Sequence, residues 1–219
     1  MAAQPTLSNF THGQQIPMSY EDVLRLVDED VHAEWVNGEV IIVMPPSDRH
    51  QVLVLWLARD IASYTEVFDL GEVGVAPFAM RIRLGGPARE PNILVVLQDH
   101  LDRFTPQRLI GPVDSLVEVI SPENACRDQV ETRREYAAAS VTEYWLVDPC
   151  PSMTPLVIYR LGESGEYLPV APDADGPDAS GVLPGFWLDP AWLCQAPLPK
   201  PLAIMQRVAP AAMRAALAV

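Results

Sequence analysis

The residue most able to do chemistry is a carboxylate inside an apolar strand. Residues 116–121 read Leu-Val-Glu-Val-Ile-Ser, so Glu118 is the charged exception in a segment typical of a strand covered on both faces. A buried carboxylate is unfavourable unless it is paired, protonated or bound to a cation. One interpretation is a salt bridge with Arg81 or Arg83, and the other is a functional site.

Three more polar residues stand where elements begin or turn. Asn92 opens the apolar strand 92–97, where it is either a strand-start amide or a site residue. Glu34 lies in a hairpin directly before Trp35, as an exposed edge-strand acid or a site acid. His50 opens a long helix, where a capping or surface role is the simpler interpretation.

The helix after Glu118 also carries candidate side chains. Thr132, Arg133 and Tyr136 lie on this segment, which is expected over 124–139. A helix that follows an acidic strand can direct side chains back to the carboxylate, or it can simply present a charged face to solvent. We therefore keep these three residues as candidates beside Glu118.

Hydrophobic periodicity and turn residues predict the elements that position these side chains. Asn37-Gly38 is a strong hairpin turn, and Ser47 is a suitable helix cap. The predicted helices are a short one from Ser19 and longer ones over 48–66, 124–139 and 202–218. The predicted strands are 33–36, 39–44, 73–84, 92–97, 116–121, 143–147, 156–161, 166–170 and 184–188, with a helical or irregular connection over 99–112.

This mixture predicts the α/β (α+β) class, with a mixed central sheet flanked by helices after an N-terminal helix and hairpin. We expect a flexible arm over 1–18, one domain over 19–195, and a Pro-rich linker with an Ala-rich helix over 196–219. Neither a GxGxxG loop after a strand nor a GxxxxGK[ST] loop occurs, so phosphate-loop nucleotide binding has no support.

The composition limits the partners. The formal net charge is −14, which does not favour DNA as a partner, because phosphate binding usually uses a basic face. No apolar run is long enough to span a membrane, and because no basic segment precedes an apolar stretch near residue 1, we expect no secretory signal. Three dispersed cysteines suit reduced thiols. We expect a cytoplasmic protein, and a homodimer is an open alternative.

Taken together, the motifs resemble the Uma-two family of proposed restriction endonucleases, a branch of the PD-(D/E)XK nuclease-like superfamily. The resemblance covers about residues 19–193. Its carriers are the segments 34–40 (EWVNGEV), 44–47 (MPPS) with His50, 74–77 (GVAP), 90–96 (EPNILVV), 117–122 (VEVISP), Tyr136 and 143–149 (EYWLVDP).

The resemblance implies a divalent metal, usually Mg²⁺ with Mn²⁺ as a substitute, held by an Asp after Pro and by the Glu of the next strand. It also implies a Glu on the first hairpin and a Lys on the following helix. Here the Glu residues are Glu118 and Glu34, but the Asp position is Asn92 and the Lys position is Thr132. Arg133 is adjacent to Thr132 but points about 100° round the helix.

Three hypotheses follow. The first is a nuclease-like protein whose metal site, Asn92 and Glu118, is weak or lost, with no functional cofactor. The second is an active Mg²⁺-dependent endonuclease that uses Glu34, Glu118 and the Asn92 carbonyl, with Arg133 or Arg134 in place of the lysine. The third is a non-enzymatic oligomerisation or interaction module whose C-terminal helix docks on a partner. We prefer the first.

Overall fold

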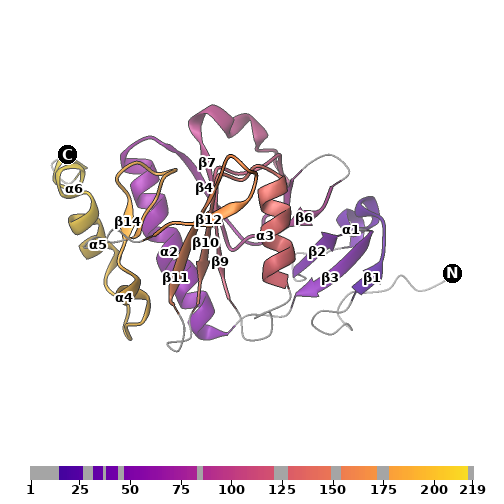
Figure 1. Ribbon diagram of the computed structural model, residues 1–219, viewed down its shortest axis with the longest axis horizontal. Coiled ribbons are helices and arrows are strands. Elements are labelled where there is room, and N and C mark those ends of the chain that lie inside the picture. The colour runs from indigo at the N-terminus through magenta and orange to yellow at the C-terminus, as the bar shows by residue number, and fades with distance from the viewer. Residues whose placement is uncertain are drawn as a thin grey trace.

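Two mixed sheets form the framework of the fold, and helices pack around the second of them (Figure 1). The computed structural model describes residues 15–26, 32–36, 38–43, 47–82, 86–120, 128–148, 154–171 and 178–216. Within these residues the first sheet has the strand order β1-β3-β2-β6-β5-β8. Its strands are β1 (Gln15–Pro17), β2 (His32–Val36), β3 (Glu39–Val43), β5 (Met80–Arg81), β6 (Ala88–Arg89) and β8 (Leu109–Ile110).

The second sheet carries the strand with Glu118. Its order is β12-β11-β10-β9-β7-β4, and only β9 and β10 pair in parallel within the described part of the chain. Its strands are β4 (Gly71–Val75), β7 (Ile93–Leu97), β9 (Ser115–Val119), β10 (Glu143–Val147), β11 (Leu156–Leu161) and β12 (Tyr167–Pro169). A small third sheet pairs β13 (Asp178–Ala179) with β14 (Trp187–Leu188).

The described helices differ in length and in the face that they cover. They are α1 (Tyr20–Leu26), α2 (Asp48–Val67), the 3₁₀ helix η2 (Gln98–Arg103), α3 (Asp128–Ala138), α4 (Pro190–Leu193), α5 (Pro201–Val208) and α6 (Pro210–Ala216). In Figure 1, α3 lies on the side of the first sheet, whereas α5 and α6 lie at the opposite end of the molecule.

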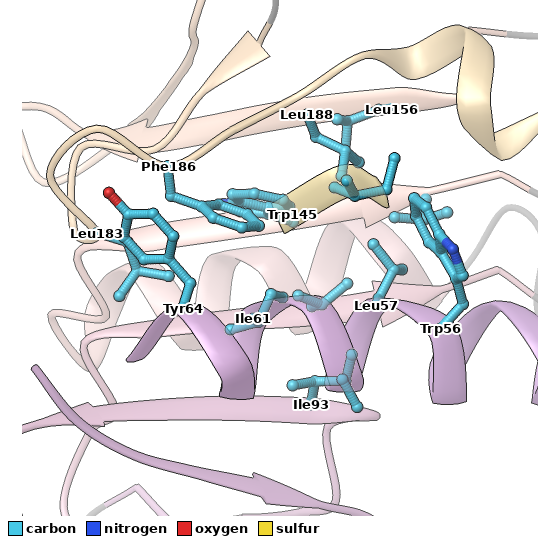
Figure 2. Close-up of a cluster of buried hydrophobic side chains, with 14 of the residues drawn as sticks. Trp56, Leu57, Ile61, Tyr64, Ile93, Trp145, Leu156, Leu183, Phe186 and Leu188 are labelled. Carbon is cyan, nitrogen blue, oxygen red and sulfur yellow. The ribbon is translucent and has the colours of Figure 1, made fainter. Parts of the chain in front are cut away.

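One face of the second sheet packs against α2 and the C-terminal segments. The Trp145 and Phe186 rings are stacked with centroids 6.0 Å apart, and the Tyr64 ring meets Phe186 edge-on at 5.0 Å. Figure 2 shows these rings beside Leu57 and Ile61 of α2. Aromatic burial of this extent makes this face the main core of the fold.

The opposite face of the sheet positions the candidate site. The strand registers place Leu94, Leu116, Tyr144 and Tyr159 side by side on four neighbouring strands. Side chains alternate between the faces of a strand, so Glu118, two residues after Leu116, also points to this face. Glu118 therefore lies on the side covered by α3, away from the α2 core.

The long helix α2 confirms the predicted helix over 48–66. Its cap is Ser47, whose Oγ accepts a hydrogen bond from the His50 backbone N–H at 3.3 Å. Leu53, Leu57 and Ile61 recur at four-residue spacing and are buried against the sheet. The predicted hairpin is also confirmed as β2 and β3, with Gly38 at a φ of +88° in its turn.

The predicted strand over 73–84 is wrong as one element. Residues 71–75 form β4 of the second sheet, whereas Met80–Arg81 form β5 of the first. Pro77 lies between them and has no N–H to donate to a ladder. Residues 15–17, which the sequence placed in the N-terminal arm, form β1 and pair with β3.

The predicted helix over 202–218 is two helices, α5 and α6, because Pro210 cannot continue the hydrogen-bond ladder. Ile204, Met205 and Met213 are buried in the same cluster as the α2 core, and the Trp56 indole donates to the Pro199 carbonyl at 2.7 Å. The apolar side chains expected to dock on a partner thus pack against this chain's own α2.

Several predicted features lie outside the described residues. These are residues 1–14 of the arm predicted over 1–18, Asn37 of the hairpin turn, Arg83, Ser121 at the end of the predicted strand 116–121, and residues 124–127 of the predicted helix 124–139. Among the described helices, none combines the length and apolar character that crossing a membrane requires.

Candidate functional site

Glu118 projects from β9 and is partly exposed. Its Oε1 accepts a hydrogen bond of 2.9 Å from the hydroxyl of Tyr136, a residue of α3 that is fully buried. The backbone N–H of Asn92 also donates to this carboxylate. The expected salt bridge to Arg81 is absent, because that guanidinium lies 4.1 Å from the centroid of the Tyr20 ring instead.

The surroundings of Glu118 favour its neutral form. Burial is the largest cause and the negative charge of Glu34 is the second, and together they raise the pKa of Glu118 to about 8. The hydrogen bonds from Tyr136 and Asn92 and the charge of Arg89 oppose this rise. At pH 7 the neutral carboxylic acid therefore predominates.

Asn92 uses its side chain to complete the end of the sheet. It lies directly before β7, which pairs antiparallel with β9, and its Oδ1 accepts a hydrogen bond of 2.7 Å from the Val119 backbone N–H. The side-chain oxygen of Asn92 thus takes the place of a backbone carbonyl of β7 as the acceptor for Val119, because the pairing of β7 with β9 ends at Ile93 and Val117. One lone pair of the expected ligand oxygen is committed to the backbone, and the group carries no charge.

His50 lies at the same end of β9. Its Nε2 is 3.0 Å from the Val119 carbonyl oxygen, and its Nδ1 is buried with no hydrogen-bond partner among the described residues. Burial lowers the pKa of His50, while contacts with Val119 and Asn92 act in the opposite direction. The surface interpretation is wrong, because only 5% of the residue is exposed. His50 and Asn92 together hold the strand end.

Glu34 is not an isolated edge-strand acid. The Arg89 Nη1 lies 2.6 Å from Glu34 Oε2, and its Nη2 and Nε lie 2.9 and 3.0 Å from Glu135 Oε2. Only 8% of the Arg89 side chain is exposed. One buried guanidinium therefore joins the first hairpin to α3.

Glu90 adds a further carboxyl group to this cluster. Its backbone N–H lies 3.4 Å from Glu34 Oε1, a long hydrogen bond. Burial first and the charge of Glu34 second raise the pKa of Glu90 to about 7. The charge of Glu34 thus raises the pKa of both Glu90 and Glu118, and the three residues come from different parts of the chain.

The helix α3 delivers only some of its candidates to Glu118. Tyr136 reaches the carboxylate, and Thr132, one turn earlier on the same helix, is partly exposed. The Arg133 guanidinium carbon lies 4.8 Å from the centroid of the Tyr159 ring. Arg133 is thus held over an aromatic ring, in the direction that its 100° offset from Thr132 suggested.

The donor set does not fit a divalent metal well. Mg²⁺ prefers anionic oxygens in octahedral geometry, but Glu34 is bound to Arg89, and Asn92 is a neutral amide whose oxygen already accepts the Val119 N–H. Within the described ranges, no group of three His, Cys, Asp or Glu side chains is arranged to hold a metal ion. The cluster thus consists of the carboxyl group of Glu118, the amide of Asn92, and the Glu34 carboxylate, whose charge is balanced by Arg89.

The sequence reasoning missed two members of this cluster, Arg89 and Glu135. Arg89 stands directly before the segment Glu90-Pro-Asn, and Glu135 directly before Tyr136. The position of Arg89 beside a predicted buried strand was the one sequence signal that it could belong to the site. Its partners, at positions 34 and 135, are too distant in the chain for spacing to reveal.

Comparison with known proteins agrees with this architecture. The sequence model of the family Uma2, described as "Putative restriction endonuclease", matches residues 20–191. A crystal structure described as a putative nuclease belonging to DUF820 from Anabaena variabilis is similar, with a TM-score of 0.65 and 18% sequence identity. The match covers 81% of this chain and 98% of that one, and at this identity it shows the fold alone. A search of curated proteins found no match.

Proposed function

The chain belongs to the Uma2 family, and from this premise we propose that it is a restriction-endonuclease-like protein whose metal-dependent phosphodiesterase site is impaired or lost. The location of the site is the Glu118 end of β9, where Glu34, Asn92 and Tyr136 also converge. In this proposal the fold of the family is kept, and the chemistry of phosphodiester hydrolysis is not.

The observation that carries the proposal is the state of Asn92. Metal-assisted hydrolysis needs a cation that activates water and stabilises charge on the phosphate. Holding such a cation favours two or more anionic oxygens, and Asn92 contributes a neutral oxygen that already accepts the Val119 N–H. Thr132, at the position where the family resemblance implies a lysine, supplies no positive charge either.

Incubation with supercoiled plasmid DNA tests this proposal. We expect the wild-type protein to leave the plasmid intact in millimolar Mg²⁺ or Mn²⁺, at the level of a metal-free control. Glu118→Ala should be indistinguishable from the wild type, as should Glu131→Ala, which changes an exposed acid of α3. Cleavage by the wild type that Glu118→Ala abolishes and Glu131→Ala preserves would contradict the proposal and establish the active endonuclease instead.

Three further properties stay predictions from the sequence. They are DNA as a weakly supported partner, a homodimer, and a cytoplasmic location. The net charge of −14 is the reason for expecting poor binding to nucleic acid at physiological salt.

A further inference from the structure

Arg89 is unusual among the basic residues of this protein. Among the described arginines and lysines it is the one that is buried, with 7% of the residue exposed. It comes from the two-residue strand β6, whose Ala88 pairs with Trp35 of the hairpin. Burying a guanidinium removes its hydration, so it persists only where carboxylates replace that hydration.

The compensation is provided by carboxylates from two other elements. Glu34 of β2 is bound through Nη1, and Glu135 of α3 is bound through Nη2 and Nε together. Their side chains are 21% and 26% exposed, so both pairs are largely shielded from water. A planar guanidinium suits this geometry because its donors point in fixed directions toward two acceptors.

The other two described arginines near the site, Arg81 and Arg133, do not bridge these carboxylates. Arg81 lies over Tyr20 and Arg133 over Tyr159, both on aromatic rings. The carboxyl groups of Glu34 and Glu135 meet at one guanidinium, and the charge of Arg89 also acts to lower the pKa of Glu118. Without a cation at this place, Glu34 and Glu135 would lose the positive charge that they share.

We infer that the Arg89 guanidinium is the resident cation of this site, taking the place of a divalent metal, so that the hairpin and α3 are joined without any bound ion. The inference rests on the proposed loss of the metal-dependent site. It adds a specific cause for metal independence, namely that the family's hairpin carboxylate, Glu34, is bound to an internal cation.

Thermal unfolding of the full chain, in EDTA and in millimolar MnCl₂, tests this inference. The wild type should unfold at the same temperature in both. Arg89→Gln leaves Glu34 and Glu135 unpaired, so its Tm should fall by about 6–12 °C in EDTA. Mn²⁺ should restore part of this loss, because a cation can then reach the two carboxylates. Arg89→Lys keeps the charge and should show a smaller loss and no response to Mn²⁺.

A matched control is Arg25→Gln, which breaks an exposed ion pair with Asp22 of 3.4 Å. It should change the Tm by no more than about 2 °C.

Three results would overturn the inference. They are a wild-type Tm that Mn²⁺ raises, an Arg89→Gln variant that is no less stable than Arg25→Gln, and an Arg89→Lys variant that responds to Mn²⁺ as Arg89→Gln does. If Arg89→Gln does not fold, the Arg89→Lys and wild-type results decide. Plasmid cleavage by a wild type whose Tm ignores Mn²⁺ would contradict the proposed function alone.

Discussion

Asp60→Asn is expected to be more stable than the wild type at pH 8, by about 2–4 kcal/mol in the free energy of unfolding. Asp60 lies in α2, is 0% exposed, and has no hydrogen-bond partner for either carboxyl oxygen among the described residues. Burial raises its pKa from 3.8 to about 7, and the charge of Arg59 acts in the opposite direction. Ionising it inside the fold is therefore unfavourable.

The size of this effect changes with pH in a defined window. Above about pH 4 the unfolded chain releases the Asp60 proton, while the folded chain keeps it until about pH 7. The wild type therefore loses stability as the pH rises from 4 to 7, and this loss stays constant above pH 7. Asp60→Asn has no such proton, so the difference between the two proteins should vanish near pH 4.

Urea unfolding at pH 4, 6 and 8 measures the effect. Glu90 and Glu118 also have raised pKa values and contribute the same trend, but to both proteins equally. Asp102→Asn, which changes an exposed acid of η2, is the control and should stay within about 0.5 kcal/mol of the wild type at each pH. A difference at pH 8 no larger than that at pH 4 would show that Asp60 ionises without penalty.

Glu143→Ala is expected to destabilise the protein by about 3 kcal/mol or more, because it leaves buried donors without acceptors. Glu143 is 0% exposed at the start of β10. Its Oε1 accepts from the Trp145 indole at 2.8 Å and from the Ser180 hydroxyl at 2.6 Å, and its Oε2 accepts from the Gly181 N–H at 2.6 Å. The carboxylate thus fixes the segment after β13 against the sheet.

Urea unfolding at pH 7 also measures this second effect. Glu143→Gln keeps one acceptor oxygen and should recover part of the loss. Glu163→Ala removes an exposed acid from the turn between β11 and β12 and should be neutral. Equal stabilities for Glu143→Ala and Glu163→Ala would mean that the Glu143 network adds nothing to folding.

Local patterns were sufficient for the long elements. The Ser47 cap and the apolar positions Val52, Leu55, Trp56 and Tyr64 predicted α2, although Val52 and Leu55 are exposed in the structure. The Asn37-Gly38 turn predicted the hairpin of β2 and β3. The division into two sheets was not predictable, because β5, β6 and β8 have two residues each and carry no period of their own. These short strands exist through pairing with segments distant in the chain.

The grouping of the candidate residues around Glu118 was more predictable than their contacts. The apolar strand around Glu118 marked the carboxylate, and the positions of Asn92 at a strand start and of Tyr136 on the following helix made them candidates, which the structure brings next to it. Two contacts could not be predicted: the hydrogen bond from the Val119 N–H to Asn92, and the pairing of Arg89 with Glu34 and Glu135. Both depend on how side chains from different elements meet, and residue spacing along the chain does not determine that. For the same reason the sequence suggested Arg81 for Glu118, whereas Tyr136 is the partner.

Titration with Mn²⁺ tests the central claim most directly, because it measures the cation site without requiring a DNA substrate. By electron paramagnetic resonance of free Mn²⁺, the wild type should bind no ion at millimolar concentration. Asn92→Asp should bind Mn²⁺ at least about tenfold more tightly than the detection limit set by the wild type, since it adds an anionic oxygen beside Glu118. The double variant Asn92→Asp/Glu118→Gln should lose that gain. Tight binding by the wild type, or no gain with Asn92→Asp, would contradict a site that keeps its place in the fold and whose metal affinity is limited by the missing charge at position 92.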